Sequence, residues 1–93
     1  MNLSNFLDIL QKSRIYLGMT LNECKKNILY KIDSVNIEDE KLKLRLYEIG
    51  FFVGSQVQVL NISALKKTML VHVLDSCFAI KTNIAKHIEV EYD

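Results

Sequence analysis

The segment LKLRLYEIGFFVGSQVQVL, residues 42–60, constrains the fold of this chain more than any other. Leu42, Leu46 and Ile49 are spaced as one stripe of an amphipathic helix. Gly50 follows at once, and a glycine in the left-handed conformation is a common helix terminator. Farther on, two glutamines alternate with two valines, as in a half-buried strand. The segment therefore predicts a short helix, a glycine turn and a strand in immediate succession.

Apolar patterns elsewhere predict further short elements. The helix described above is expected to run from about residue 39 to 49. Within the strand that follows it, Leu60 and Ile62 change phase relative to the two valines, which indicates a β-bulge or a bend. The predicted strands cover residues 27–35, 56–62, 69–74, 77–81 and 88–91, and a single helical turn covers residues 82–86.

These elements fit one small domain. A chain of 93 residues, 49% apolar and 25% charged, has the size and composition of a single soluble globular unit. Five short strands cannot bury a face as a flat sheet, whereas closure into a barrel removes the exposed strand edges. We therefore expect a mainly β fold with short helices. In it, a small barrel of about five strands carries the helix between its first two strands, lying across the barrel mouth.

The stretch RLYEIGFFVGSQVQVL resembles the R-L-x-x-(L/M)-G-(F/M)-x-x-G-x-x-(V/F)-x-V signature of the FeoA family, small accessory proteins of bacterial ferrous-iron uptake. Residues 19–21 are similar to the family's usual opening, and residues 88–91 resemble its closing strand. The resemblance covers residues 19–93 and implies that they form an SH3-like barrel domain. The residues on marked positions are Arg45, Leu46, Gly50, Phe51, Gly54, Val57 and Val59.

The chain departs from the family pattern in two turns. Val53 stands where the family usually has a proline before the second glycine, and residues 63–68 replace a proline-containing loop. The chain contains no proline, so neither turn has the fixed φ that proline supplies. We therefore expect a softer turn at Gly54.

Residues 1–18 lie outside the resemblance and are predicted to form an N-terminal helical extension. Leu3, Phe6, Leu7 and Leu10 make an apolar stripe at helical spacing. An isolated helix of this length is marginal in water, so its stripe must pack on another surface. Three alternatives follow. The helix covers an open edge or end of its own barrel, it docks on a partner, which includes a homodimer formed through residues 1–18, or the segment is disordered.

The charge balance and hydropathy exclude several classes of protein. A net charge of +1 does not favour nucleic-acid binding, for which a pI above about 9 is typical. No apolar run approaches the roughly 20 residues of a membrane span, and the N-terminus lacks the pattern of a secretory signal. We therefore expect a cytoplasmic protein without direct membrane insertion, recruited to the inner face of the membrane by its partner.

The sequence shows no pattern of catalytic or metal-binding residues. Cys24, Cys77, His72 and His87 are the only soft or borderline metal ligands, and they lack the spacing of known metal sites. Cys77 is expected opposite His72 across a hairpin, an arrangement more typical of cross-strand packing than of catalysis. No glycine-rich phosphate loop is present. We expect no enzyme activity, no cofactor and no metal site.

A partner-binding surface is the functional feature that the sequence favours. Phe51 and Phe52 cannot easily both be buried in one short turn, so at least one should be exposed, with Leu65 nearby. The alternative is that both pack under the helix. Arg45 lies mid-helix, where it can pair with an acid such as Glu48, cap a carbonyl at the barrel end or contact a partner, including as an arginine finger for a GTPase. The predicted partner-binding residues are Phe51, Phe52, Leu65, Lys66, Lys67 and Arg45.

The family resemblance implies a function as well as a fold. It implies a non-enzymatic accessory protein that docks on the cytosolic GTPase domain of a FeoB-type ferrous-iron transporter. Two alternatives stay open. One is a regulatory barrel related to the C-terminal domain of DtxR-type metal-dependent repressors, although residues 1–18 are too short for a helix-turn-helix domain. The other is a small-barrel nucleic-acid binder that uses scattered lysines.

Overall fold

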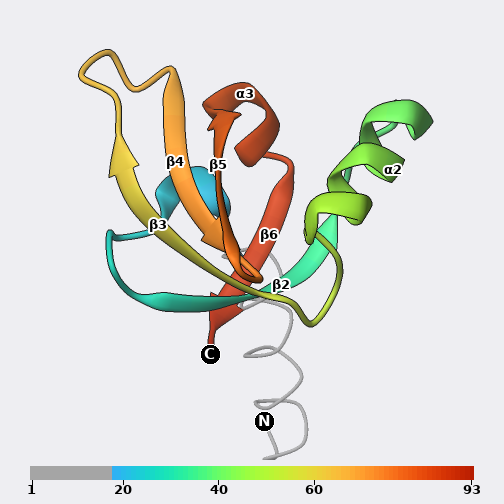
Figure 1. Cartoon of the computed structure of the whole chain (residues 1–93), viewed down its shortest axis with the longest axis horizontal. Coiled ribbons are helices and arrows are strands. Elements are labelled where there is room, and N and C mark those ends of the chain that lie inside the picture. The colour runs from blue at the N-terminus through green and yellow to red at the C-terminus, as the bar shows by residue number, and fades with distance from the viewer. Residues whose placement is uncertain (1–17) are drawn as a thin grey trace, which may run out of the picture.

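The computed structural model describes residues 18–93, which form one strongly curved antiparallel sheet with helices at its margins (Figure 1). Along the sheet the strands are ordered β1-β6-β2-β3-β4-β5. The predicted N-terminal helix lies outside the described residues. The strands are β1 (Met19–Thr20), β2 (Leu29–Val35), β3 (Gln56–Ile62), β4 (Thr68–Val73), β5 (Ser76–Lys81) and β6 (Ile88–Tyr92), and the helices are the 3-10 helix η1 (Leu21–Glu23), α2 (Glu40–Ile49) and α3 (Thr82–Ala85).

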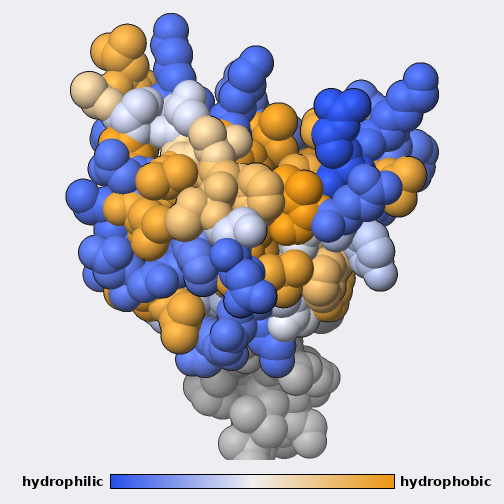
Figure 2. Space-filling view, viewed as in Figure 1, coloured by the Kyte–Doolittle hydropathy of each residue, from blue (hydrophilic) through white to orange (hydrophobic). Residues whose placement is uncertain are grey.

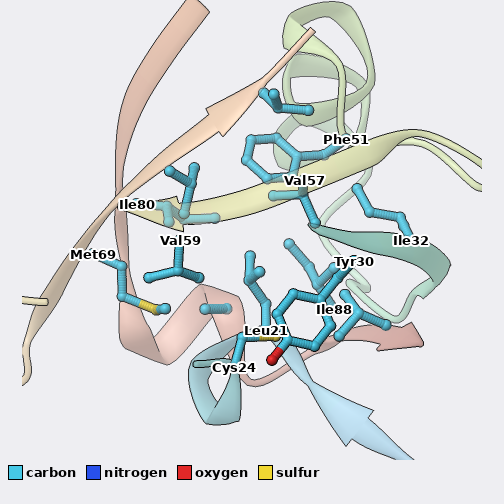
Figure 3. Packing of buried hydrophobic residues seen from close by; sticks show 14 of the residues in the cluster. Leu21, Cys24, Tyr30, Ile32, Phe51, Val57, Val59, Met69, Ile80 and Ile88 are labelled. Atoms are coloured by element: carbon cyan, nitrogen blue, oxygen red, sulfur yellow. The ribbon is translucent and has the colours of Figure 1, made fainter. Parts of the chain in front are cut away.

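The hydrophobic core lies inside the curve of the sheet. In β3 and β4 the buried positions alternate with more exposed ones, because successive side chains of a strand point to opposite faces. Phe51 and Leu21, both at most 1% exposed, enter the cluster from opposite sides (Figure 3). The largest fully buried side chains are Tyr30, Phe51, Leu21, Ile32, Met69, Ile88, Val57, Val59, Val71 and Val73.

The prediction of a mainly β fold with short helices is confirmed, and β2 to β6 agree with the predicted strands within two residues. The predicted bulge in β3 is present, since the register against β4 shifts between Val59 and Asn61. Two details differ. The two-residue strand β1 was not predicted, and the strand expected from residue 27 begins at Leu29. Asn27 has a φ of 63°, which interrupts the extended conformation before that point.

The two end strands of the sheet do not pair with each other. Within residues 18–93, β1 pairs only with β6, and β5 pairs only with β4. Barrel closure is therefore less complete than expected, because the backbone groups on one side of β5 face no partner strand in this part of the chain.

Helix α2 is terminated at both ends by local hydrogen bonds. The Asp39 side chain accepts hydrogen bonds from the backbone N–H groups two and three residues later, at 3.0 and 3.2 Å, as an N-cap does. At the other end, Phe51 N–H donates to the Leu46 carbonyl at 2.9 Å and Gly50 N–H donates to the Tyr47 carbonyl at 3.1 Å. This pair of bonds is a Schellman motif, so the glycine stop predicted from the sequence is confirmed.

The position of α2 differs from the expectation that it lies across the barrel mouth. Figure 1 shows the helix projecting from one side of the barrel. Of the predicted apolar stripe, only Leu46 is buried, whereas Leu42 and Ile49 are half-buried. The first two turns carry four of the five charged side chains of the helix, which stay in water. Leu46 therefore belongs to the core, while Leu42 and Ile49 pack against its margin.

The two cysteines are free thiols in very different surroundings. Cys24 is 4% exposed, and burial, together with the nearby Glu23 carboxylate, raises the pKa of its thiol to about 12. Cys77 is exposed on β5. Because the thiolate is the reactive form, we expect an alkylating reagent at neutral pH to modify Cys77 in the native protein and Cys24 only after unfolding.

Timed alkylation followed by mass spectrometry checks this expectation. The native protein should gain one label, a Cys77→Ser variant none, and both should gain a further label in denaturant. Labelling of Cys24 in the native protein as fast as labelling of Cys77 would contradict the burial of that thiol.

Candidate protein-docking site

The end of α2 and the turn that follows it place two aromatic side chains side by side at the surface. The ring centroids of Tyr47 and Phe52 are 5.3 Å apart, and their planes are tilted by 48°, a geometry that aromatic pairs favour. Tyr47 is 61% exposed and Phe52 is half-buried. Gly50 and Gly54 have φ values of 118° and 93°. These left-handed turns reverse the chain within a few residues, which brings Phe52 back against the helix.

The aromatic pair belongs to a groove with a volume of about 530 Å³ between α2 and the end of β2. We call it the α2 groove. Lys43 is the only charged residue among those that line it, so its surface is largely apolar with one cation. Such a groove suits an apolar segment that carries an acidic group. Its lining residues are Ser34, Val35, Lys43, Tyr47, Phe51, Phe52 and Val53.

The two adjacent phenylalanines have different roles. Phe51 is 1% exposed, belongs to the core and forms the floor of the α2 groove. Phe52 is half-buried and contacts the exposed ring of Tyr47. Phe51 is therefore buried and Phe52 only partly exposed, so the expectation of an exposed phenylalanine is met only in part.

The structure separates Leu65, Lys66 and Lys67 from the α2 groove. They lie in the loop between β3 and β4, whereas Phe52 precedes β3 (Figure 1). A strand of seven residues spans about 20 Å, so the two ends of β3 are far apart. The expectation that Leu65 lies near the aromatic turn is wrong, because β3 stays continuous through its bulge. Leu65, 76% exposed, forms a separate apolar spot.

Arg45 lies exposed on α2, away from the residues that line the groove. Within residues 18–93 its side chain makes no hydrogen bond or ion pair, so the expected pairing with Glu48 is not formed. Among residues 18–93, nothing therefore holds the Arg45 guanidinium, which is exposed to solvent.

Two residues of the surface were missed by the sequence analysis. Tyr47 was assigned no role, and Val53 was considered only as part of the turn before Gly54, yet they are 61% and 67% exposed. A signal for Tyr47 was present, because Leu44 and Tyr47 are spaced at i and i+3 on the side of the helix opposite the buried stripe. Leu44 is 59% exposed. A second apolar stripe on a short helix indicates a surface left for another molecule.

A second groove, of about 430 Å³, lies where the connection before α2 approaches α3. It contains His87 and Glu38, but no third ligand for a metal ion. Across residues 18–93, no three His, Cys, Asp or Glu side chains gather as a metal site would require. Cys77 does lie opposite His72 on the paired strands β4 and β5, as expected from the hairpin.

In the described part of the chain, no helix has the length and hydropathy needed to cross a bilayer.

The fold is similar to solved structures of iron transport proteins. Iron(II) transport protein A from Clostridium thermocellum superposes with a TM-score of 0.74 and 20% identity, over 80% of this chain and 45% of that one. FeoA from Stenotrophomonas maltophilia superposes with a TM-score of 0.69 and 27% identity, over 80% of this chain and 91% of that one. That protein was solved in complex with zinc and is described as a procaryotic SH3 domain protein. The chain thus spans less than half of the Clostridium protein, and the SH3-like fold is confirmed.

A regulatory protein shares the same fold. A manganese-dependent transcriptional repressor in complex with manganese superposes with a TM-score of 0.73 and 16% identity, over 82% of this chain and 37% of the repressor. At this identity the likeness shows the fold alone. No curated protein sequence matches the chain.

The sequence itself matches one family. The profile of the FeoA domain covers residues 19–92, which include the sheet and its helices from β1 to the end of β6. The matched range contains the helix, the glycine turns and the strand from which the resemblance was first drawn. With four fifths of its length matched in this way, the chain belongs to the FeoA family.

Proposed function

We propose that this chain is a non-enzymatic accessory protein of ferrous iron uptake that docks on the cytosolic GTPase domain of a FeoB-type transporter through the α2 groove. Membership of the FeoA family supports the link to iron transport. The Stenotrophomonas maltophilia relative is described as a candidate bacterial ferrous iron transport activating factor. In this function the protein acts in the cytoplasm and reaches the inner face of the membrane through its partner.

The aromatic pair of exposed Tyr47 and half-buried Phe52 carries the proposal. Tyr47 and Phe52 lie in ring contact above an apolar groove, and Val53 extends the same exposed surface. Aromatic side chains at the centre of an interface supply most of its binding energy. Because the two rings already support each other, less side-chain entropy is lost when a partner covers them. Lys43 at the groove supplies a cation for a carboxylate of the partner.

Replacing both Tyr47 and Phe52 with alanine should weaken binding to the GTPase domain about 10- to 100-fold, since two contacts of the kind that dominate interfaces are lost. The measurement is a calorimetric titration against the GTPase domain of the FeoB-type protein from the same genome, with and without GTP. The GTP hydrolysis rate of that domain, measured in the same mixtures, reports whether docking changes nucleotide turnover.

A double variant in the loop at the other end of β3, Leu65→Ala with Lys66→Ala, is the matched control and should retain wild-type affinity. Circular dichroism of both variants verifies that they fold. Binding that survives the aromatic substitutions but is lost in the loop variant would move the interface to the β3–β4 loop. Failure of the wild-type protein to bind in any nucleotide state would count against the GTPase domain as the partner.

A regulatory barrel is the second candidate, and the fold shared with the manganese-dependent repressor supports it. In that function the α2 groove would take a segment of a DNA-binding protein instead of a GTPase. The two candidates therefore differ in the first titration, because a regulatory barrel would show no saturable binding to the GTPase domain.

A further inference from the structure

Among residues 18–93, no strand pairs with the outer side of the end strand β5, which leaves one row of its backbone groups open. It pairs with β4 through a hairpin whose two loop residues are Leu74 and Asp75, closed by the pair Val73 and Ser76. Leu74 has a φ of 52°, as the first central residue of the mirror-image turns that favour two-residue hairpins requires. The register of β5 is thereby fixed from its first residue.

This register determines which backbone groups point outward. In an antiparallel pair, residues that exchange two hydrogen bonds alternate with residues that exchange none. The residues that close a two-residue hairpin exchange both bonds, so Ser76, Phe78 and Ile80 bond to β4. The N–H groups of Cys77 and Ala79, and the carbonyl groups of the same residues, then point away from β4, toward the open side of the sheet.

The side chains along this edge do not block a further strand. Cys77, Ala79 and Lys81 are all exposed, and only Lys81, the last residue of β5, is charged. Natural edge strands usually carry charges or prolines at the middle of the strand to prevent pairing, and β5 has neither there. Ala79 lies opposite Leu70, which is 41% exposed on the same face. Figure 2 shows a band of apolar surface over β4 and β5.

We propose that β5 pairs with β5 of a second copy of this chain in antiparallel orientation, with Ala79 on the two-fold axis. In this register Ala79 exchanges two hydrogen bonds with Ala79 of the second copy. Cys77 of each copy then lies opposite Lys81 of the other. The two barrels become joined by one continuous sheet, and Leu70 and Ala79 of both copies form one apolar row across the axis.

Charge complementarity favours a second copy as the occupant. In this register Lys81 of one copy lies opposite Cys77 of the other, near Asp75 in the hairpin turn that precedes its β5, and the two lysines lie at opposite ends. A small central alanine lets the two strands approach without a steric conflict. Since the contact consists of one strand edge and a narrow apolar row, we expect a weak dimer that forms with rising concentration.

The position of Ala79 on the two-fold axis gives a sharp test, because a side chain introduced there lies opposite the same side chain of the second copy. Full-length Ala79→Lys should be monomeric, since two lysines would oppose each other directly. Ala79→Glu should be monomeric for the same reason. An equimolar mixture of the two variants should form a dimer, because lysine then faces glutamate. Analytical ultracentrifugation over a concentration series measures all three samples and the wild-type protein.

Ala64→Lys, at an exposed position in the loop after β3, is the matched control and should dimerise like the wild-type protein. Amide exchange gives an independent readout, since the Ala79 N–H should exchange more slowly as the wild-type dimer forms. A wild-type monomer at high micromolar concentration would overturn the proposal. So would a dimer that persists in both single variants, which would place self-association elsewhere, for example in residues 1–17.

Discussion

Replacing Leu46 with alanine is expected to lower the free energy of unfolding by about 2–5 kcal/mol. Leu46 is 5% exposed and is the only residue of α2 that belongs to the buried core. Its carbonyl also accepts the hydrogen bond from Phe51 that closes the Schellman motif, and Phe51 lies in the same core. Loss of the leucine side chain therefore opens a cavity at the point where the projecting helix is held to the barrel.

Leu44→Ala is the matched control for this substitution. It removes the same atoms from the same helix, but Leu44 is 59% exposed, so we expect a change within about 0.5 kcal/mol. Urea denaturation of both variants, followed by circular dichroism, gives the two free energies. Equal losses at the two positions would show that α2 is not anchored to the core through Leu46.

Gly50→Ala is expected to lower the free energy of unfolding by about 2–4 kcal/mol. The φ of 118° is one that side chains with a Cβ rarely adopt. A Cβ at this position would also lie 2.9 Å from Leu74 Cγ and 3.2 Å from Val73 Cγ2. The substitution thus combines backbone strain with steric overlap at the contact between the end of α2 and the β4–β5 hairpin.

Gly54→Ala separates these two effects. Gly54 also has a positive φ, of 93°, but among residues 18–93 no atom outside its chain neighbours lies within 4 Å of the added Cβ. We therefore expect a smaller loss, about 1–2 kcal/mol, from backbone strain alone. Thermal or urea denaturation of the two variants measures the difference. A loss at Gly54 as large as that at Gly50 would show that contact with the hairpin contributes nothing.

The sequence alone determined most of the local structure. The apolar spacing before Gly50 predicted α2, and the glycine predicted its Schellman end, which the hydrogen bonds confirm. Alternating residues predicted β2 to β6 within two residues, and the change of phase at Leu60 predicted the bulge. These features depend on the conformational preferences of single residues and on the period of buried side chains, so neighbours in the chain are sufficient to specify them.

The candidate site was predicted only in part for the same reason. The sequence predicted an exposed phenylalanine after Gly50, but it could not show that Phe51 is buried and Phe52 half-buried. That choice depends on which direction the chain takes into the core. It also grouped Leu65 with the aromatic turn, although β3 holds them about 20 Å apart. The place of Tyr47 in the candidate docking site depends on its ring contact with Phe52 across the turn, which the sequence does not show.

Tertiary structure alone decided which surfaces remain open. The same short strands could have closed a complete barrel. In the observed strand order, however, the sheet ends at β5, and no strand within residues 18–93 pairs with its outer side. Likewise, α2 packs on the core through Leu42, Leu46 and Ile49 and leaves a groove beside β2. The local sequence determines the spacing of buried side chains in each helix or strand and the residues at which it ends. The curvature of the sheet determines which of these elements contact each other. Residues far apart in the chain set that curvature together.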